Sequence, residues 1–235
     1  MPPRAILFDA VGTLIYAEPS VVETYARVGQ ALGSSRSLGE IKEIFRAAYQ
    51  RSECLFALPG DGSTLDRLPT SDERERQRWR QVVGEVFADL PPSAAEEALD
   101  RLWRHFALPH HWRLYNDVAP VWDELSRRGF LLAVASNFDS RLESICRDLA
   151  PLDGCRHLFI SSRIGYPKPS AQFFRAVEDA LGLSPEQLLL VGDDPTSDIA
   201  GAARCGWNTQ LVCRDGTVDS GAIRSLTELS AKLTG

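Results

Sequence analysis

Two patterns of apolar and polar residues divide the chain. Ala5 to Phe8 form a short apolar run that ends in Asp9 and a glycine turn, which is typical of a buried parallel strand. Between about residues 17 and 108, apolar positions recur at helical spacing, and no strand pattern is convincing. From about residue 113, helical and strand patterns alternate, which predicts βαβ units with right-handed crossovers. We therefore expect an α/β protein with a Rossmann-like, doubly wound parallel sheet as its core and an inserted all-α cap.

The expected elements follow from this periodicity. The helical block has helices over 21–32, 38–54, 72–90 and 94–106, an N-cap at Ser71 and a loop over 58–63. The second half has helices over 117–129, 139–149 and 199–205 and after Pro169, and strands over 130–135, 157–160, 187–191 and 209–212. Because the helical block follows the first strand directly, it is expected to cover the sheet edge at Asp9. The sequence thus predicts a core domain of residues 1–16 and 112–235 and a cap domain of residues 17–111.

Composition and charge narrow the function classes. The formal net charge of -6 argues against nucleic acid or an anionic membrane as the main partner. No apolar stretch approaches the roughly 20 residues of a membrane span, and the first apolar run has no signal-peptide cleavage site. The five cysteines are odd in number and form no Cys-x-x-Cys pair, which favours reduced thiols. We expect a cytoplasmic protein, monomeric or homodimeric, that acts on a small molecule.

Polar groups follow the ends of the predicted strands. In chain order they are Asp9, Gly12 and Thr13; Ser136 and Asn137; Lys168; and Asp193 and Asp198. Because the carboxyl ends of parallel strands share one edge of the sheet, these groups are expected to converge there. Lys168 is one of only three lysines among 26 basic residues, which indicates that a compact ammonium is needed at this place.

These segments, in this order and spacing, resemble the haloacid dehalogenase superfamily of hydrolases. The segments that carry the resemblance span residues 4–14, 134–143, 166–169 and 191–194. The helical block between the first two is similar to the cap-type-one branch, and the last three segments resemble the rhythmically-expressed-gene-type subgroup. The resemblance implies a five-stranded core sheet, a bound Mg²⁺ ion, an aspartate nucleophile and a small phosphorylated substrate.

The resemblance also implies a role for each strand end. Asp9 would attack phosphorus and form an aspartyl phosphate. Asp9, Asp193 and the backbone carbonyl of Val11 would bind Mg²⁺, and Asp198 would orient metal-bound water or a ligand. The groups expected to hold the phosphoryl oxygens are Thr13, Ser136 and the backbone amides of the Gly12 and Asn137 turns, while Lys168 would neutralise charge. Asp194 is open between a role in the site and helix capping.

Val11 departs from the family pattern. Phosphatases of this superfamily usually carry an aspartate at this position, which protonates the leaving oxygen and later activates water. The loss of such a group costs about 10²–10⁴-fold in rate. A slow phosphatase, or one for good leaving groups such as acyl phosphates, is the favoured interpretation.

Two alternatives stay open. One is a hydrolase that resembles 2-haloacid dehalogenases or, with Lys42 as a Schiff-base lysine, phosphonoacetaldehyde hydrolases. The acidic pair Asp193 and Asp198 argues against the dehalogenase, because metal-free displacement of halide by Asp9 gains nothing from further negative charge. The other is a low-turnover protein that binds or senses a phosphorylated metabolite.

Other prominent residues have ordinary structural interpretations. We expect His110 and His111 to form an exposed polar pair, because no partner cluster for a metal is evident. The five tryptophans are expected to pack in the core or the cap. The charged run over 73–80 is expected to be a solvated helix face, with a place for some of its arginines at the cap opening left open.

Overall fold

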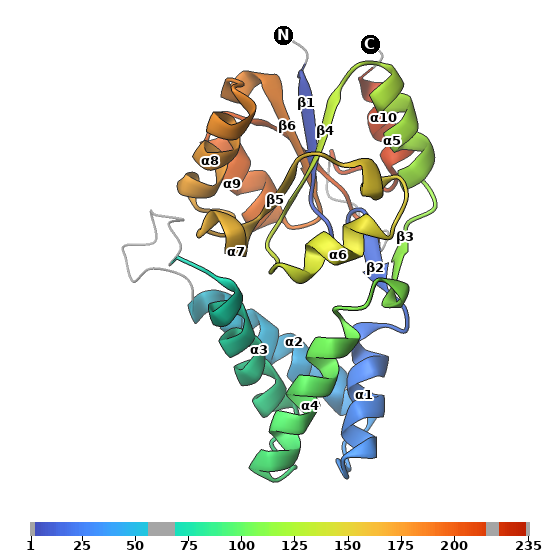
Figure 1. Ribbon diagram of the computed structural model, residues 1–235, viewed down its shortest axis with the longest axis vertical. Helices are drawn as coiled ribbons and strands as arrows, with labels where there is room; N and C mark the ends of the chain where they lie inside the picture. Colours follow the sequence, from blue (N-terminus) through green and yellow to red (C-terminus); the bar gives the residue numbers. More distant parts are fainter. Residues whose placement is uncertain (1–2, 56–68, 215–220, 234–235) are drawn as a thin grey trace.

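The computed structural model describes residues 3–55, 69–214 and 221–233. Its main sheet has five parallel strands in the order β5-β4-β1-β6-β7, so β1 is central (Figure 1). The strands are β1 (Ala5–Phe8), β4 (Leu131–Ser136), β5 (Leu158–Ile160), β6 (Leu188–Gly192) and β7 (Asn208–Leu211). The predicted α/β class is confirmed, and the four later strands lie within one residue of their expected bounds.

Alternate residues of the central strand pack on opposite faces of the sheet. Ile6 and Phe8 belong to one hydrophobic cluster, whereas Ala5 and Leu7 belong to another. The first face is covered by α5 (Val118–Arg127), α6 (Arg141–Arg147) and α10 (Leu226–Lys232), and the second by α8 (Ala171–Leu181) and α9 (Gly201–Arg204). A strand buried on both faces is apolar at every position, which explains the uninterrupted run before Asp9.

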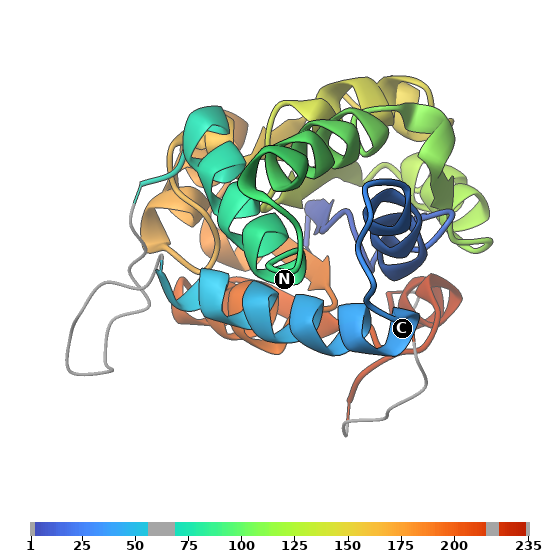
Figure 2. The same cartoon turned by 90° about the horizontal axis from the view of Figure 1, so that it is seen from below.

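Four helices form a second layer across one end of the sheet (Figures 1 and 2). They are α1 (Val21–Ala31), α2 (Leu38–Leu55), α3 (Asp72–Val86) and α4 (Pro92–His105), and together we call them the helical cap. Their apolar faces meet in a cluster of their own, which includes Tyr25 and Phe87. Ser71 caps α3 as predicted. The helix was expected to reach residue 90 but ends at Val86, because Phe87 and Leu90 bury themselves in this cluster from non-helical backbone.

A short antiparallel ribbon joins the helical cap to the sheet. It consists of β2 (Ile15–Ala17) and β3 (Trp112–Leu114), which pair residue by residue. Neither strand was expected, since three residues are too few to show a periodicity. Both predicted domain boundaries, after residue 16 and before residue 112, fall in this ribbon, and we propose it as the junction between the cap and core domains.

Several short elements complete the fold. They are α7 (Ser161–Ile164) and 3₁₀ turns over Pro109–His111, Leu152–Gly154 and Pro185–Gln187. The predicted helix over 199–205 starts earlier than expected, as a π-helical turn over Pro195–Ala200 that leads into α9. The earlier start has a local cause, since Asp194 caps the turn and Pro195 occupies its first position.

Two expectations concern the whole chain. The four cysteines whose side chains are described are all free thiols, as predicted: Cys146, Cys155, Cys205 and Cys213. Within the described ranges, no helix combines the length and apolar character that a membrane crossing requires. The loop expected over 58–63 lies outside the described residues.

Candidate active site

Asp9 is delivered by the central strand and held by the loop that follows. Its backbone N–H donates to the carbonyl of Val191 on β6 at 2.9 Å, so the ladder hydrogen bonding continues past the end of β1. Gly12 has a φ of +90°, and a Cβ at this position would lie 2.2 Å from Oδ2 of Asp193. A larger residue would therefore displace that carboxylate as well as strain the backbone. The glycine expected at the phosphate site is required because two strand ends approach each other here.

Lys168 is the buried centre of the site. Its ammonium donates to Oδ1 of Asp9 at 2.8 Å, to Oδ1 of Asp198 at 2.6 Å and to the carbonyl of Ala135 at 2.6 Å. These acceptors use all three N–H donors of the group. Burial alone would lower the pKa of Lys168, but the carboxylates of Asp198 and Asp9 outweigh it and raise the pKa. The ammonium is therefore a fixed positive charge beside Asp9.

Asn137 positions Lys168 through its side chain. Its Oδ1 accepts the backbone N–H of Lys168 at 2.7 Å, and its Nδ2 donates to the backbone carbonyl of Lys168 at 2.9 Å. This pair of bonds ties the end of β4 to the segment that carries the lysine. The sequence interpretation used only the backbone amide of the Asn137 turn, so this positioning role was missed. The sequence carries no signal for this role, because the two residues are 31 positions apart and only the fold brings the Asn137 amide to the backbone of Lys168.

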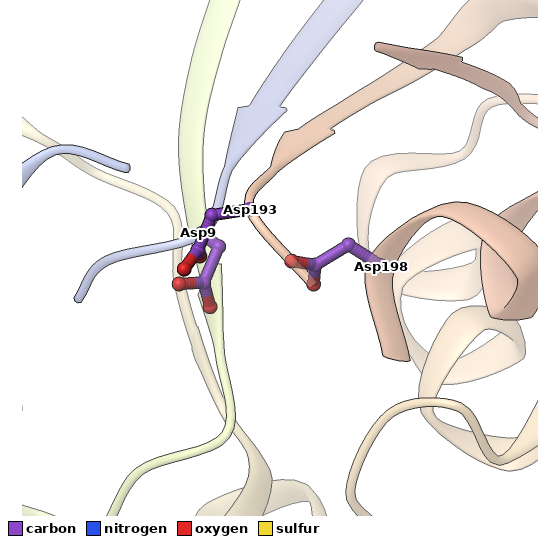
Figure 3. A group of neighbouring side chains, drawn as sticks. All are labelled: Asp9, Asp193 and Asp198. Atoms are coloured by element: carbon purple, nitrogen blue, oxygen red, sulfur yellow. The ribbon is translucent and has the colours of Figure 1, made fainter. Parts of the chain in front are cut away.

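Three carboxylates converge at the same edge of the sheet. One oxygen each of Asp9, Asp193 and Asp198 lies within 4.8 Å of the other two (Figure 3). Asp193 is exposed on one side, but the protein packed around its carboxyl group, followed by the charges of Asp9 and Asp198, raises its pKa. Burial is also the main cause that raises the pKa of Asp198, which Lys168 partly opposes. When all three carboxylates are ionised, the ammonium of Lys168 neutralises one of them and a net charge of about -2 is left. A divalent cation would neutralise this charge.

The two aspartates that follow Asp193 have separate roles. Asp194 accepts the backbone N–H groups of Thr196 and Ser197, both at 2.7 Å, so its carboxylate caps the π-helical turn. Of the two interpretations left open for Asp194, the structure shows the capping. Asp198 is buried instead, bonded to Lys168 through one oxygen and to the backbone N–H of Asp194 through the other, at 3.1 Å. A Cβ on Gly192 would lie 2.1 Å from that second oxygen, so glycine is again required by a neighbouring carboxylate.

The remaining predicted residues surround this cluster. Thr13 is fully buried, and its hydroxyl donates to Oδ1 of Asp193 at 3.3 Å. Ser136 is buried at the carboxyl end of β4, the strand beside β1. Val11 is different, since it is 37% exposed and lines the cavity under the helical cap. The structure therefore brings together every predicted side-chain group of the site, and the roles of these residues stay predictions.

A cavity of about 270 Å³ separates the helical cap from the sheet and reaches the site at Val11 and Asn137. Aromatic and aliphatic side chains from all four cap helices line it, together with Glu75 and Arg78. The charged run over 73–80 was expected to be a solvated face, with a place for some of its arginines at the cap opening left open. The expectation of a solvated face is wrong for Glu75 and Arg78, which line the cavity. It failed because helical spacing turns every third or fourth residue inward whatever its charge. Trp79 and Trp103 also line the cavity.

The histidine pair differs from its expected environment. His110 is exposed as predicted, but His111 is half-buried and stacks on His105 at the end of α4, with 3.5 Å between ring centres. Burial, followed by the charge of His111, lowers the pKa of His105 to about 4. The interpretation as an exposed pair failed because the 3₁₀ turn over Pro109–His111 folds back on α4, which no pattern indicates.

Contacts hold the helical cap against the sheet. Asp72, the first residue of α3, accepts the backbone N–H of Ser140 at 3.0 Å and the hydroxyl of Ser162 at 2.6 Å. Arg141 lies 3.6 Å from the ring centre of Trp103 in α4 and donates to its carbonyl at 3.2 Å. Arg141 is also paired with Asp139 at 2.7 Å. These contacts therefore attach the cap to the core domain beside the cavity.

A doubly wound sheet with an aspartate at the end of its central strand, a buried lysine and further aspartates defines a class of hydrolases. The haloacid dehalogenase-like hydrolase family model matches residues 3–206, and the chain belongs to this family. It is 31% identical over 220 residues to haloacid dehalogenase-like hydrolase domain-containing protein 3 of Mus musculus, covering 92% of this chain and 84% of the relative. The expected subgroup is also confirmed. The rhythmically expressed gene 2 protein of Drosophila melanogaster is 25% identical over 221 residues, covering 89% of this chain and 82% of that protein.

A solved structure shows the same fold. The putative hydrolase YfnB of Bacillus subtilis, bound to magnesium, aligns over 100% of both chains with a TM-score of 0.74 and 21% identity. This likeness extends over the sheet and the helical cap together. It shows that the arrangement of the two layers is that of a known fold.

Proposed function

We propose that the protein is a Mg²⁺-dependent phosphatase that forms an aspartyl phosphate on Asp9 and acts on a small phosphorylated substrate. The observation that carries the proposal is the bond of 2.8 Å from the buried Lys168 ammonium to Asp9 within a cluster of three carboxylates. An ammonium beside a nucleophilic carboxylate offsets the repulsion between that carboxylate and an anionic phosphate. The four free thiols fit a cytoplasmic location, to which we extend the proposal.

The reaction has two displacements at phosphorus. In the first, an oxygen of Asp9 forms a bond to phosphorus while the bond to the leaving oxygen breaks, and the leaving oxygen keeps the electron pair. In the second, water attacks the phosphorus of the aspartyl phosphate, which releases inorganic phosphate and restores Asp9. Lys168 would stay protonated throughout, and Thr13 and Ser136 would donate hydrogen bonds to phosphoryl oxygens. This division turns one difficult displacement into two easier ones.

The carboxylates fit the metal that the family implies. Asp9 and Asp193 would bind Mg²⁺ with the backbone carbonyl of Val11, and Asp198 would hold Lys168 and orient a water or ligand. When bound, Mg²⁺ supplies positive charge to the phosphoryl oxygens and offsets the repulsion within the cluster. The raised pKa values of Asp193 and Asp198 support this assignment, because a bound cation stabilises carboxylates whose ionised form is disfavoured by burial and then by the neighbouring carboxylates.

Val11 limits the chemistry that the site can perform. Its side chain carries no proton to give to a leaving oxygen and no base to activate water. Substrates whose leaving group departs readily as an anion, such as acyl phosphates, need the least help in the first step. The second step lacks the base with every substrate, so we expect the aspartyl phosphate to accumulate during turnover.

The alternative reactions have less support. A Schiff-base mechanism needs a lysine in the cavity, but Lys42 in α2 is exposed and is not among the described residues that line it. Metal-free displacement of halide by Asp9 is disfavoured beside Asp193 and Asp198, whose charges make the site more negative. Binding without turnover would not require a nucleophile paired with a buried ammonium.

Phosphate release from acetyl phosphate and phenyl phosphate, measured with Mg²⁺ and with a chelator, tests the proposal. We expect metal-dependent release and a phosphorylated Asp9 peptide after a rapid acid quench. Asp9→Asn should abolish both, whereas Asp123→Asn, a matched change on the exposed side of α5, should alter neither. No release from either substrate would overturn the proposal and direct the search to 2-haloacids and phosphonoacetaldehyde.

A further inference from the structure

The cavity under the helical cap is large enough for an aromatic ring system. An apolar cavity of about 150 Å³ holds a benzene molecule. The volume of about 270 Å³ under the cap is therefore sufficient for a larger group, of about two fused rings. Aromatic residues from all four cap helices and from the ribbon line it, among them Tyr25, Phe45, Trp79, Trp103 and Trp112. Such faces bind flat apolar groups in stacked or edge-to-face contact.

The charged residues of the lining are already neutralised. Arg78 is paired with Glu75 at 3.5 Å, both of these side chains are 9% exposed, and Arg78 also donates to the hydroxyl of Ser52 at 3.0 Å. Arg141 forms two bonds of 2.7 Å to Asp139, one from Nε and one from the terminal Nη2. Each guanidinium among the described lining residues thus has its own carboxylate. A negatively charged group in the cavity would lose its water without gaining an unpaired cation, which is costly.

The cavity opens onto the active site, so it lies where the leaving group of a substrate would be. It meets the site at Val11 and Asn137, whose neighbours in sequence and space are Asp9 and Lys168. A phosphoryl group at Asp9 would therefore place the remainder of its substrate under the cap. The leaving oxygen would lie near Val11, which is 37% exposed, so water reaches the place where charge develops.

We propose that the substrate is an aryl phosphate or an aromatic acyl phosphate. Its organic part is a neutral, apolar aromatic group of one or two rings, bonded to phosphorus through a phenolic or carboxyl oxygen. This inference rests on the proposed function and narrows its substrate class. The bond from phosphorus to the aryl or acyl oxygen breaks, Asp9 takes the phosphoryl group, and the oxygen leaves with the electron pair. A phenolate then takes a proton from water, whereas a carboxylate stays ionised. Such leaving groups depart without the acid that Val11 lacks, while their bodies match the lining of the cavity.

Three phosphate esters with similar leaving oxygens test this inference. They are phenyl phosphate, 2-naphthyl phosphate and 6-sulfo-2-naphthyl phosphate, each compared with acetyl phosphate. We expect kcat/KM for the 2-naphthyl ester to exceed that for the phenyl ester by about 10- to 100-fold, because the second ring buries apolar surface. The sulfonate, which would bring a charge into the cavity, should lose this gain. Calorimetry should show that neutral 2-naphthol binds and its sulfonate does not.

Two neighbouring positions on α3 test whether the preference for the 2-naphthyl ester comes from the cavity. Val83 lines the cavity and its neighbour Val82 does not, although both are 1% exposed. Val83→Phe should lower the ratio of kcat/KM for the 2-naphthyl ester to that for acetyl phosphate by at least about tenfold. Should this variant fail to fold, Val83→Thr against Val82→Thr makes the same comparison with smaller changes, and only Val83→Thr should lower the ratio.

The outcomes separate the two proposals. Equal kcat/KM values for the three esters, with acetyl phosphate still hydrolysed, would overturn the aromatic substrate and leave the phosphatase. Absence of metal-dependent hydrolysis with every substrate would overturn the phosphatase. In that case, binding of 2-naphthol that Val83→Phe abolishes would still support an aromatic ligand in the cavity.

Discussion

Replacement of Val11 by aspartate should restore the missing proton transfer. The side chain at this position is 37% exposed, so a carboxylate there stays hydrated and the free energy of unfolding should change by no more than about 0.5 kcal/mol. A positioned acid–base group contributes about 10²–10⁴-fold to the rate, which corresponds to about 2.7–5.4 kcal/mol in the activation barrier. We therefore expect kcat/KM for phenyl phosphate to rise by about 10²–10⁴-fold in Val11→Asp.

The size of the effect should depend on the substrate and on the kinetic parameter. Because kcat/KM reports the step up to formation of the aspartyl phosphate, acetyl phosphate should gain less than about tenfold, since its leaving group needs no proton. The value of kcat should rise for both substrates, because water attack on the intermediate uses the new base. A burst of acetate release in the parent protein, lost in the variant, would show that change of rate-limiting step.

The control for this experiment is Val11→Asn, which has the shape of aspartate without its proton chemistry. Stopped-flow release of phenol and acetate, with phosphate measured in parallel, gives both steps. The reasoning is refuted if asparagine gives the same gain as aspartate, or if kcat/KM rises equally for the two substrates.

Three further predictions follow from the described contacts. Lys168→Met leaves the buried Asp9 without its cation, so urea unfolding should show a loss of about 3–5 kcal/mol, and an unchanged midpoint would contradict the pairing. Gly12→Ala places a Cβ 2.2 Å from Oδ2 of Asp193, so metal-dependent phosphate release should disappear while circular dichroism stays native. The pKa of His105 falls from 6.5 to about 4 on folding, so the unfolded chain binds the extra proton and stability is lost as pH falls from 6.5 toward 4. His105→Gln should flatten this part of a plot of melting temperature against pH, and an unchanged slope would exclude the histidine as its source.

The sequence predicts the parallel sheet well because its central strands, β1, β4 and β6, are largely buried on both faces. A run such as Ala5–Phe8 has a pattern that few other structures share. The convergence of Asp9, Lys168 and Asp193 could be predicted for a related reason, since the carboxyl ends of parallel strands must lie at one edge.

The cap shows where such reasoning ends. Helical spacing identifies each cap helix, but it does not specify how four helices pack or which polar residues they enclose. Glu75 and Arg78 therefore look solvated in the sequence and are buried against the cavity in the structure. The shape and polarity of that cavity, and with them the substrate class, depend on contacts between residues far apart in the chain.

The ribbon of β2 and β3 links the nucleophile to the cap mechanically. Ile15 begins β2, and its carbonyl accepts the backbone N–H of Gly12 at 2.9 Å in the loop that follows Asp9. A force that moves the cap is thus passed within six residues to the backbone around the nucleophile. We therefore expect the position of the cap over a bound ligand to affect the alignment of Asp9. A ligand that fills the cavity imperfectly should then slow the chemical step as well as bind weakly.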